Sequence, residues 1–378
     1  MSGGRRTWDE SDVRIRANKR GSRPRTKERP AHQDALVGRV VTVDRGRYTV
    51  DLGSAGPGSP VLAVRAKDLR RTPVVTGDLV GVVGDTSGAE GTLARLIRLE
   101  QRATVLRRSS DDTDPVERVV VANADQLVIV VAAANPTPRT GFIDRSVVAA
   151  HDAGIEPLLC ITKTDLAAPD PLLEYYARSG LRVLTSSPAR DAAEVTRVGQ
   201  HETLELEPGL LAELREELGS RVSVMLGHSG VGKSTLVNAL TGSERSTGGV
   251  NSVTGRGRHT SSSALALNPD WGDETTWVID TPGIRSFGLA HVAPASVVAA
   301  YPDLAPGAET CPKGCTHAPD AAGCGIAALV AAGEAGPAGP ARLESLRRLL
   351  GVAPESGLPE AKELGASPAG REWDSLEP

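Results

Sequence analysis

Gly227-His-Ser-Gly-Val-Gly-Lys-Ser234 fits the phosphate-loop pattern G-x-x-x-x-G-K-[ST]. An apolar run at 222–226 precedes this stretch and a helix-forming run begins at Ser234, so the required strand–loop–helix context is present. Glycines let backbone N–H groups turn inward around phosphates, and the helix that follows points its positive end at them. We expect this loop to bind the phosphates of a nucleotide through Gly227, His228, Ser229, Gly230, Val231, Gly232, Lys233, Ser234 and Thr235. Lys233 would contact the β- and γ-phosphates, and the Ser234 hydroxyl would bind Mg²⁺.

A second motif, Asp280-Thr-Pro-Gly283, follows the apolar strand predicted at 276–280. The Asp280 carboxylate can hold the water shell of Mg²⁺, and the Gly283 N–H can contact the γ-phosphate. The next residue is Ile284, where Ras-like GTPases have a glutamine that orients the attacking water. The group that assists hydrolysis must therefore come from elsewhere in the chain.

Between these motifs lies the basic loop Gly255-Arg-Gly-Arg-His-Thr-Ser-Ser262. Thr260 is the natural candidate to complete the Mg²⁺ shell as a switch residue. His259 beside it can position the attacking water or act as a base. The alternative is that His259 is an exposed loop histidine, and spacing alone favours that alternative.

Thr162-Lys-Thr-Asp165 ends another predicted strand, at 157–161, and lies upstream of the phosphate loop. The Asp165 carboxylate can accept hydrogen bonds from the N1–H and the exocyclic amine of guanine together, which adenine does not offer. The stem of Lys163 would pack along the base, Thr162 and Thr164 would flank it, and the backbone near Ser186 would contact it. In an ordinary GTPase this motif follows the phosphate loop. The reversed order predicts a circularly permuted GTPase domain in an open α/β sheet, with ligand groups at the carboxyl ends of its strands.

A cysteine-rich segment follows the last of these motifs. Cys311, Cys315, His317 and Cys324 form a closed Cys₃His set of the kind that binds structural Zn²⁺. The alternative, free core cysteines, is weakened because residues 301–330 are too rich in glycine and proline to form a core. Cys160 lies in a predicted buried strand and is most simply a small apolar residue.

Residues 35–100 predict about five short strands separated by turn signals, which suits an OB-fold barrel or an SH3-like barrel. Tyr48 is the only aromatic residue there, so any contact with RNA would use phosphates rather than base stacking. The candidates for such contacts are Arg39, Arg45, Arg47, Arg65, Lys67, Arg70 and Arg71, unless these side chains are simply solvated. The expected domains are a basic arm at 1–34, the barrel at 35–100, the GTPase at 101–290, and a zinc-binding region with helices and a tail at 291–378.

The chain of 378 residues has a net charge of −4, but its first thirty residues are strongly basic. We consider this arm equally consistent with contact to a polyanion and with a solvated tail. No apolar leader follows the first residue, and the longest apolar run, at 127–134, is too short to span a bilayer. These features, with clustered cysteines, predict a cytoplasmic protein without a membrane partner.

The motif order, Gly257-Arg-His-Thr260, Asp280-Thr-Pro-Gly283 and the Cys₃His set resemble the ribosome small subunit-dependent GTPase A (RsgA) family. The resemblance covers about residues 35–335. It implies an N-terminal OB-fold, a permuted GTPase and a zinc domain, acting as a monomer in late maturation of the 30S subunit. It also implies contact with 16S rRNA, GTP hydrolysis to GDP stimulated by the 30S subunit, and catalytic roles for His259, Lys233 and Thr260.

One departure from the family is Thr162, where the family usually has asparagine. Because threonine lacks the amide that braces the pocket, we expect lower nucleotide affinity with guanine choice preserved by Asp165. Two other functions remain open from the residues alone: an unrelated phosphate-loop ATPase, and an RNA-binding scaffold with a vestigial nucleotide site. Intact Lys233, Ser234 and Asp280 argue against the scaffold.

Overall fold

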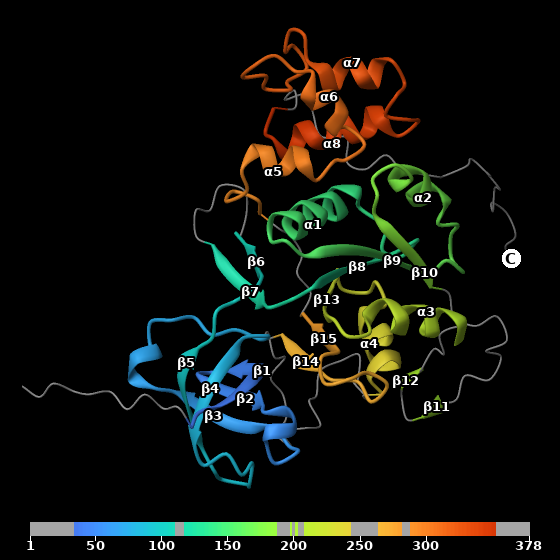
Figure 1. Ribbon diagram of the computed structural model, residues 1–378. Helices are drawn as coiled ribbons and strands as arrows, with labels where there is room; N and C mark the ends of the chain where they lie inside the picture. Colours follow the sequence, from blue (N-terminus) through green and yellow to red (C-terminus); the bar gives the residue numbers. More distant parts are fainter. Residues whose placement is uncertain are drawn as a thin grey trace, which may run out of the picture. The chain divides into compact units, whose positions relative to one another are not determined.

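The computed structural model describes residues 34–109, 117–186, 197–198, 201–202, 208–242, 264–281 and 288–352. The basic arm predicted for residues 1–34 lies outside these ranges apart from Asp34. Among the residues so described, no helix combines the length and the apolar character needed to cross a membrane. Figure 1 shows the arrangement of the elements.

The N-terminal strands form a closed barrel of β1 (Leu36–Asp44), β2 (Arg47–Asp51), β3 (Val61–Arg65), β4 (Leu79–Gly84) and β5 (Ala94–Leu99). Their order is β1-β2-β3-β5-β4, and β1 also pairs with β4, which closes the ring. Alternate residues such as Val40, Val50 and Leu96 fill its interior. The closed ring of five strands confirms the predicted N-terminal β-barrel.

The turn between β1 and β2 follows from its sequence. Arg45 and Gly46 both have positive φ, at 45° and 82°, as a two-residue hairpin turn requires. Glycine adopts that conformation without steric cost. This tight turn sets the antiparallel register of Asp44 with Arg47.

The central sheet has the order β10-β9-β8-β13-β15-β14. Its members are β8 (Gln126–Ala132), β9 (Glu156–Thr162), β10 (Arg182–Ser186), β13 (Val222–Leu226), β14 (Leu265–Leu267) and β15 (Trp277–Asp280). All are parallel except β14, which runs antiparallel to β15. Every residue of β8 and β13 is buried, because helices cover both faces of a parallel sheet. The predicted α/β class is confirmed.

Helices α1 (Thr140–Asp152) and α2 (Asp170–Tyr176) pack on one face of this sheet, and α3 (Pro208–Leu218) and α4 (Lys233–Thr241) pack on the other. Gly154, two residues after the end of α1, has φ of 67°. The sequence of residues 171–179 predicts a helix that reaches Ser179, but α2 ends at Tyr176. The Ser179 hydroxyl there donates to the Tyr176 carbonyl at 2.7 Å and accepts from the Leu181 N–H, which redirects the chain.

The C-terminal helices are α5 (Pro294–Ala299), α6 (Ala305–Glu309), α7 (Gly325–Ala331) and α8 (Gly339–Leu349). Their buried residues include Tyr301, Ile326 and Leu346, and these belong to the same apolar cluster as Ile143 of α1 and Leu159 of β9. The C-terminal region therefore shares its core with the α1 face of the sheet.

Two short β-pairs lie outside the barrel and the central sheet. The hairpin β6 (Val105–Arg108) and β7 (Arg118–Ala122) is antiparallel, as are β11 (Arg197–Val198) and β12 (His201–Glu202). The barrel meets the central sheet where Thr42 of β1 pairs with Leu265 of β14. Beside this contact, the guanidinium of Arg39 lies 5.5 Å from the centre of the Trp277 ring.

The arginines proposed as phosphate contacts divide into two groups. Arg39 donates to the Gly77 carbonyl and packs on Trp277, while Arg65 donates to the carbonyls of Leu69 and Thr72. Those two guanidinium groups are engaged in contacts within the fold. The other five basic side chains are exposed, namely Arg45, Arg47, Lys67, Arg70 and Arg71.

Candidate functional site

The phosphate loop joins β13 to α4, as the sequence predicts. Gly230 and Gly232 have φ of 84° and 88°, a region that glycine enters without strain. A side chain at Gly227 would place its Cβ 2.6 Å from the Val130 carbonyl oxygen of β8. The loop is thus shaped by backbone geometry that only glycine provides at three positions.

Residues of the loop differ in their exposure to solvent, and this indicates which of them can face a ligand and which pack on the core. Ser229 and Gly230 are exposed, whereas Val231 is buried and anchors the loop on the core below α4. The His228 ring packs against Phe142 of α1, with 4.2 Å between ring centroids. Ser234 and Thr235 are half-buried in the first turn of α4, where the positive helix end favours anionic ligands.

Lys233 and Asp280 are brought together although they lie on different elements. Because β13 and β15 are parallel neighbours, with Met225 paired to Asp280, the two carboxyl ends meet at the same edge of the sheet. The Lys233 ammonium group forms an ion pair with the Asp280 carboxylate and donates to the Thr281 carbonyl at 2.6 Å. The buried Thr281 hydroxyl donates in turn to the Met225 carbonyl at 2.7 Å.

The guanine-contact segment lies beside the phosphate loop. Thr162 ends β9, and its buried hydroxyl lies 2.5 Å from the Val231 carbonyl oxygen and 3.1 Å from the Val131 carbonyl oxygen. The threonine therefore braces the phosphate loop with its hydroxyl, which our sequence comparison with asparagine did not anticipate. Lys163 has φ of 56° and its ammonium group contacts the Asn135 carbonyl.

The remaining base-contact residues follow the same edge. Thr164 is half-buried and Asp165 is exposed, directly after the tight turn in which the Leu166 N–H bonds to the Lys163 carbonyl at 3.0 Å. Ser186 ends β10 and pairs in register with Thr162. Thr162, Ser186 and Asp280 thus end strands on one edge of the sheet, as expected for ligand sites in open α/β sheets. Asp165 and Lys233 follow strands β9 and β13 beyond the same edge. The predicted site residues His259, Thr260 and Gly283 lie outside the described residues.

The Cys₃His residues come together in the segment between α6 and α8. The ligand atoms of Cys311, Cys315, His317 and Cys324 all lie within 4.8 Å of one another. The His317 Nδ1 atom is 3.6 Å from the Cys311 sulfur and 3.7 Å from the Cys324 sulfur. Thiolate and imidazole ligands at such separations fit a tetrahedral Zn²⁺ site. Burial and the nearby charge of Arg347 both lower the pKa of His317, which favours the neutral imidazole that metals bind.

Cys324 is buried in the main apolar cluster, and Cys311 and Cys315 pack against it. The glycine- and proline-rich segment therefore does border a core, which the sequence did not predict, although the thiols converge on one another. Cys160 is fully buried in β9, and burial raises the pKa of its thiol to about 12. This matches its interpretation as an apolar residue.

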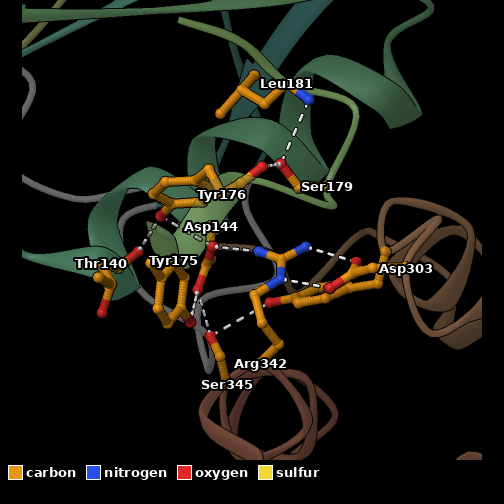
Figure 2. Close-up of polar contacts among 10 residues, drawn as sticks. Thr140, Asp144, Tyr175, Tyr176, Ser179, Leu181, Asp303, Arg342 and Ser345 are labelled. Carbon is orange, nitrogen blue, oxygen red and sulfur yellow. Dashed lines mark hydrogen bonds and ion pairs between the residues drawn. The ribbon is translucent and has the colours of Figure 1, made fainter. Parts of the chain in front are cut away.

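Sequence reasoning missed a buried polar cluster between α1, α2 and α8. Its members are Asp144, Tyr175, Tyr176, Tyr301, Asp303, Arg342 and Ser345. All of them except Tyr301 are labelled in Figure 2. Burial raises the pKa of Asp144, and the charge of Arg342 opposes that rise. Burial alone would lower the pKa of Arg342, but hydrogen bonds and the charges of Asp303 and Asp144 raise it instead. The spacing of residues in the C-terminal helix could have indicated that Arg342 is buried, because Arg342 lies on the same helical face as the buried Leu343 and Leu346.

Comparison with known proteins gives consistent matches. The model of the RsgA GTPase family matches residues 99–290. "Small ribosomal subunit biogenesis GTPase RsgA" of Pseudomonas aeruginosa (strain LESB58) is 35% identical over 75% of this chain and 77% of its own length. The protein of the same name from Pseudomonas fluorescens (strain Pf0-1) is 36% identical over 75% of this chain and 76% of its own length.

Two solved structures share the fold. YjeQ from Thermotoga maritima superposes with a TM-score of 0.57 at 23% identity, over 83% of this chain and 97% of that one. YloQ, described as a circularly permuted GTPase, gives a TM-score of 0.57 at 20% identity, over 86% of this chain and 98% of that one. Both structures share the fold of this chain, and YloQ is the one described as circularly permuted. With a family model that spans half of the chain and relatives at 35% identity, the chain belongs to the RsgA GTPase family.

Proposed function

We propose that this protein hydrolyses GTP to GDP and phosphate during late maturation of the 30S ribosomal subunit. The relatives' printed names, which refer to small ribosomal subunit biogenesis, support this role. The observation that carries the nucleotide site is the contact of Thr162 with Val231. It joins the guanine-contact segment to the phosphate loop, although 69 residues separate the two positions.

Guanine selection is assigned to Asp165. Its exposed carboxylate follows the turn at Lys163 and has two oxygens that can accept hydrogen bonds from the base edge. Lys163, held by the Asn135 carbonyl, supplies the stem that packs along the base. Thr164 and the backbone of Ser186 complete the base contacts at the neighbouring strand end.

Phosphate binding is assigned to the loop from Gly227 to Thr235, and charge neutralisation to Lys233. Lys233 is paired with Asp280, so each residue must leave the other to contact phosphate and the water shell of the metal. Ser234, with Thr260 from the switch loop, would hold Mg²⁺. When bound, the metal neutralises charge that develops on the β- and γ-phosphate oxygens.

Hydrolysis itself is assigned to the switch residues. His259 would orient or deprotonate the attacking water, since Ile284 takes the position of the usual glutamine. The Gly283 N–H would contact the γ-phosphate.

Zinc is the metal that best suits Cys311, Cys315, His317 and Cys324, because three thiolates and an imidazole are typical of closed structural zinc sites. With four protein ligands, no coordination position is left for a substrate. The proposed role is to fix the fold of the segment between α6 and α8.

Binding to 16S rRNA is assigned to the exposed basic residues of the barrel. Arg45 and Arg47 flank the β1–β2 turn, and Lys67, Arg70 and Arg71 follow β3. Side chains of this kind contact phosphates and make binding salt-dependent. We also assign a monomeric state and a cytoplasmic location, in keeping with a ribosome-associated role.

The direct test is steady-state GTP turnover with and without purified 30S subunits, with Lys233→Ala as the inactive control. We expect turnover that the 30S subunit raises severalfold and that Lys233→Ala abolishes. Hydrolysis of ATP in preference to GTP would instead support the unrelated ATPase. Binding to 30S subunits without Lys233-dependent hydrolysis would support the RNA-binding scaffold.

A further inference from the structure

A buried carboxylate connects the nucleotide-binding half of the chain to its C-terminal helix. Asp144 of α1 accepts four hydrogen bonds (Figure 2). On Oδ1 these come from the Tyr176 hydroxyl at 3.0 Å and from Arg342 Nη1 at 3.2 Å. On Oδ2 they come from the Tyr175 hydroxyl at 3.0 Å and from the Ser345 hydroxyl at 2.5 Å. Helices α1, α2 and α8 therefore meet at one carboxyl group.

The guanidinium group of Arg342 also binds a second carboxylate, that of Asp303. It donates to both carboxylate oxygens of Asp303, at 2.8 and 2.9 Å, and its guanidinium lies 4.4 Å from the centre of the Tyr301 ring. Only 3% of Arg342 is exposed, so its charge is balanced by protein groups rather than water. A buried ion pair of this kind is weak evidence for stability, because desolvation offsets the attraction. Its strict geometry can instead hold three helices in one arrangement.

The first two of these helices border the nucleotide site. Phe142, two residues before Asp144 on α1, packs against the ring of His228 in the phosphate loop. The connection from β8 to α1 contains Asn135, whose carbonyl contacts Lys163 of the guanine-contact segment. The chain then runs from Asp165 directly into α2, which carries Tyr175 and Tyr176.

The third helix, α8, contacts the Cys₃His group. Arg347 Nε donates to the backbone carbonyl of His317 at 2.8 Å. Arg347 lies five positions beyond Arg342, about one and a half helical turns along the same rigid element. Arg342 and Ser345 thus tie α8 to α1 and α2, and Arg347 ties it to a residue of the metal cluster.

From these contacts we infer that α8 couples the Cys₃His group to the nucleotide pocket, with Arg342 and Arg347 as positioning residues. Metal binding fixes His317, which fixes α8 and so the helices beside the phosphate loop and the guanine-contact segment. Bound zinc should thereby raise the affinity for the nucleotide. Coupling of two binding sites is reciprocal, so a bound nucleotide must raise the affinity for zinc by the same factor. The inference rests on the proposed binding of both ligands. The coupling acts through α1 and α2, which border the guanine side of the pocket.

The test measures zinc affinity by competition with a chromogenic chelator, in the absence and in the presence of saturating GDP. For the unmodified protein we expect GDP to raise zinc affinity by about fivefold or more, the lower end of typical allosteric coupling. In Arg347→Met and in Arg342→Met the ratio of the two zinc affinities should fall to about one. Arg347→Lys, which can still donate to the His317 carbonyl, should retain most of the ratio.

Arg348→Met is the matched control. Arg348 lies on the same helix but is exposed and is paired with Glu344 within α8, so its loss should leave the ratio unchanged. Arg347 is only half-buried, so Arg347→Met supplies the test even if Arg342→Met fails to fold. A GDP effect that persists fully in Arg347→Met overturns the inference, as does unmodified protein that binds zinc and GDP independently. Failure to bind zinc or GDP at all would instead refute the proposed function.

Discussion

Replacing Thr162 with valine tests whether the guanine-contact segment and the phosphate loop act as one unit. Valine keeps the shape of threonine but removes its hydroxyl. That hydroxyl has a single proton and two carbonyl acceptors, at 2.5 Å on Val231 and 3.1 Å on Val131. At any moment one hydrogen bond is therefore donated, and the shorter one reaches the phosphate loop.

The size of the effect follows from that count. The net loss of one hydrogen bond is about 0.5–1.5 kcal/mol, and a buried carbonyl left without its partner adds to it. We expect a total of about 1–2 kcal/mol, which corresponds to roughly 5- to 30-fold weaker nucleotide binding if the loop carries the loss. Thr162→Ser keeps the hydroxyl and should bind within about threefold of the unmodified protein.

Equilibrium titration with a fluorescent GDP analogue measures this effect, and a xanthosine analogue provides a second ligand. Because the contact positions the phosphate loop rather than the base, Thr162→Val should weaken both ligands by the same factor. If Thr162→Val binds GDP as tightly as the unmodified protein, the hydroxyl does not support the loop. A loss confined to one base would assign Thr162 to base recognition instead.

Three further outcomes are expected. His259→Ala should lower GTP turnover without changing GTP affinity, and unchanged turnover would return this residue to an exposed loop histidine. Elemental analysis should find about one zinc per chain, and Cys324→Ser should reduce that content; equal zinc content in both proteins would contradict the assigned ligand set. Burial raises the pKa of Cys160 to about 12. The native thiol thus keeps its proton where the unfolded chain loses it, above about pH 8.5. The stability that this group contributes is present below that pH and is lost as pH rises. The free energy of unfolding, measured by urea denaturation, should therefore fall less steeply between about pH 9 and 11 in Cys160→Ala than in the unmodified protein, by up to about 1.4 kcal/mol per pH unit. Equal slopes in the two proteins would contradict the assigned pKa.

The sheet was predictable because its strands are buried on both faces. The run 127–131 has no polar residue to mark an exposed side, and the structure buries all of β8. Gly227, Gly230 and Gly232 likewise signalled the phosphate loop, since the backbone there excludes a side chain or requires positive φ. These patterns could be predicted because neighbouring residues alone determine the structure that they form.

The polar cluster at Asp144 was not predictable in the same way. Asp144 and Arg342 are 198 residues apart, and each one alone is a charged residue on a helix. Only the packing of α8 against α1 turns them into a buried pair. Arg39 is a second example. The sequence suggested it as a phosphate contact, but in the folded protein it packs on Trp277 of β15, far along the chain. Sequence patterns do not reveal which charged side chains tertiary contacts will bury.

The central claim is that segments in permuted order build one guanine-nucleotide pocket, with Asp165 reading the base. Its most direct test compares the affinities of the unmodified protein and Asp165→Asn for GTP and xanthosine triphosphate. The amide reverses one hydrogen-bonding group, so Asp165→Asn should lose GTP and gain the xanthosine nucleotide, while the unmodified protein prefers GTP. If Asp165→Asn keeps the same preference for GTP, then Thr162–Asp165 is not the base-reading segment and the permuted assignment fails.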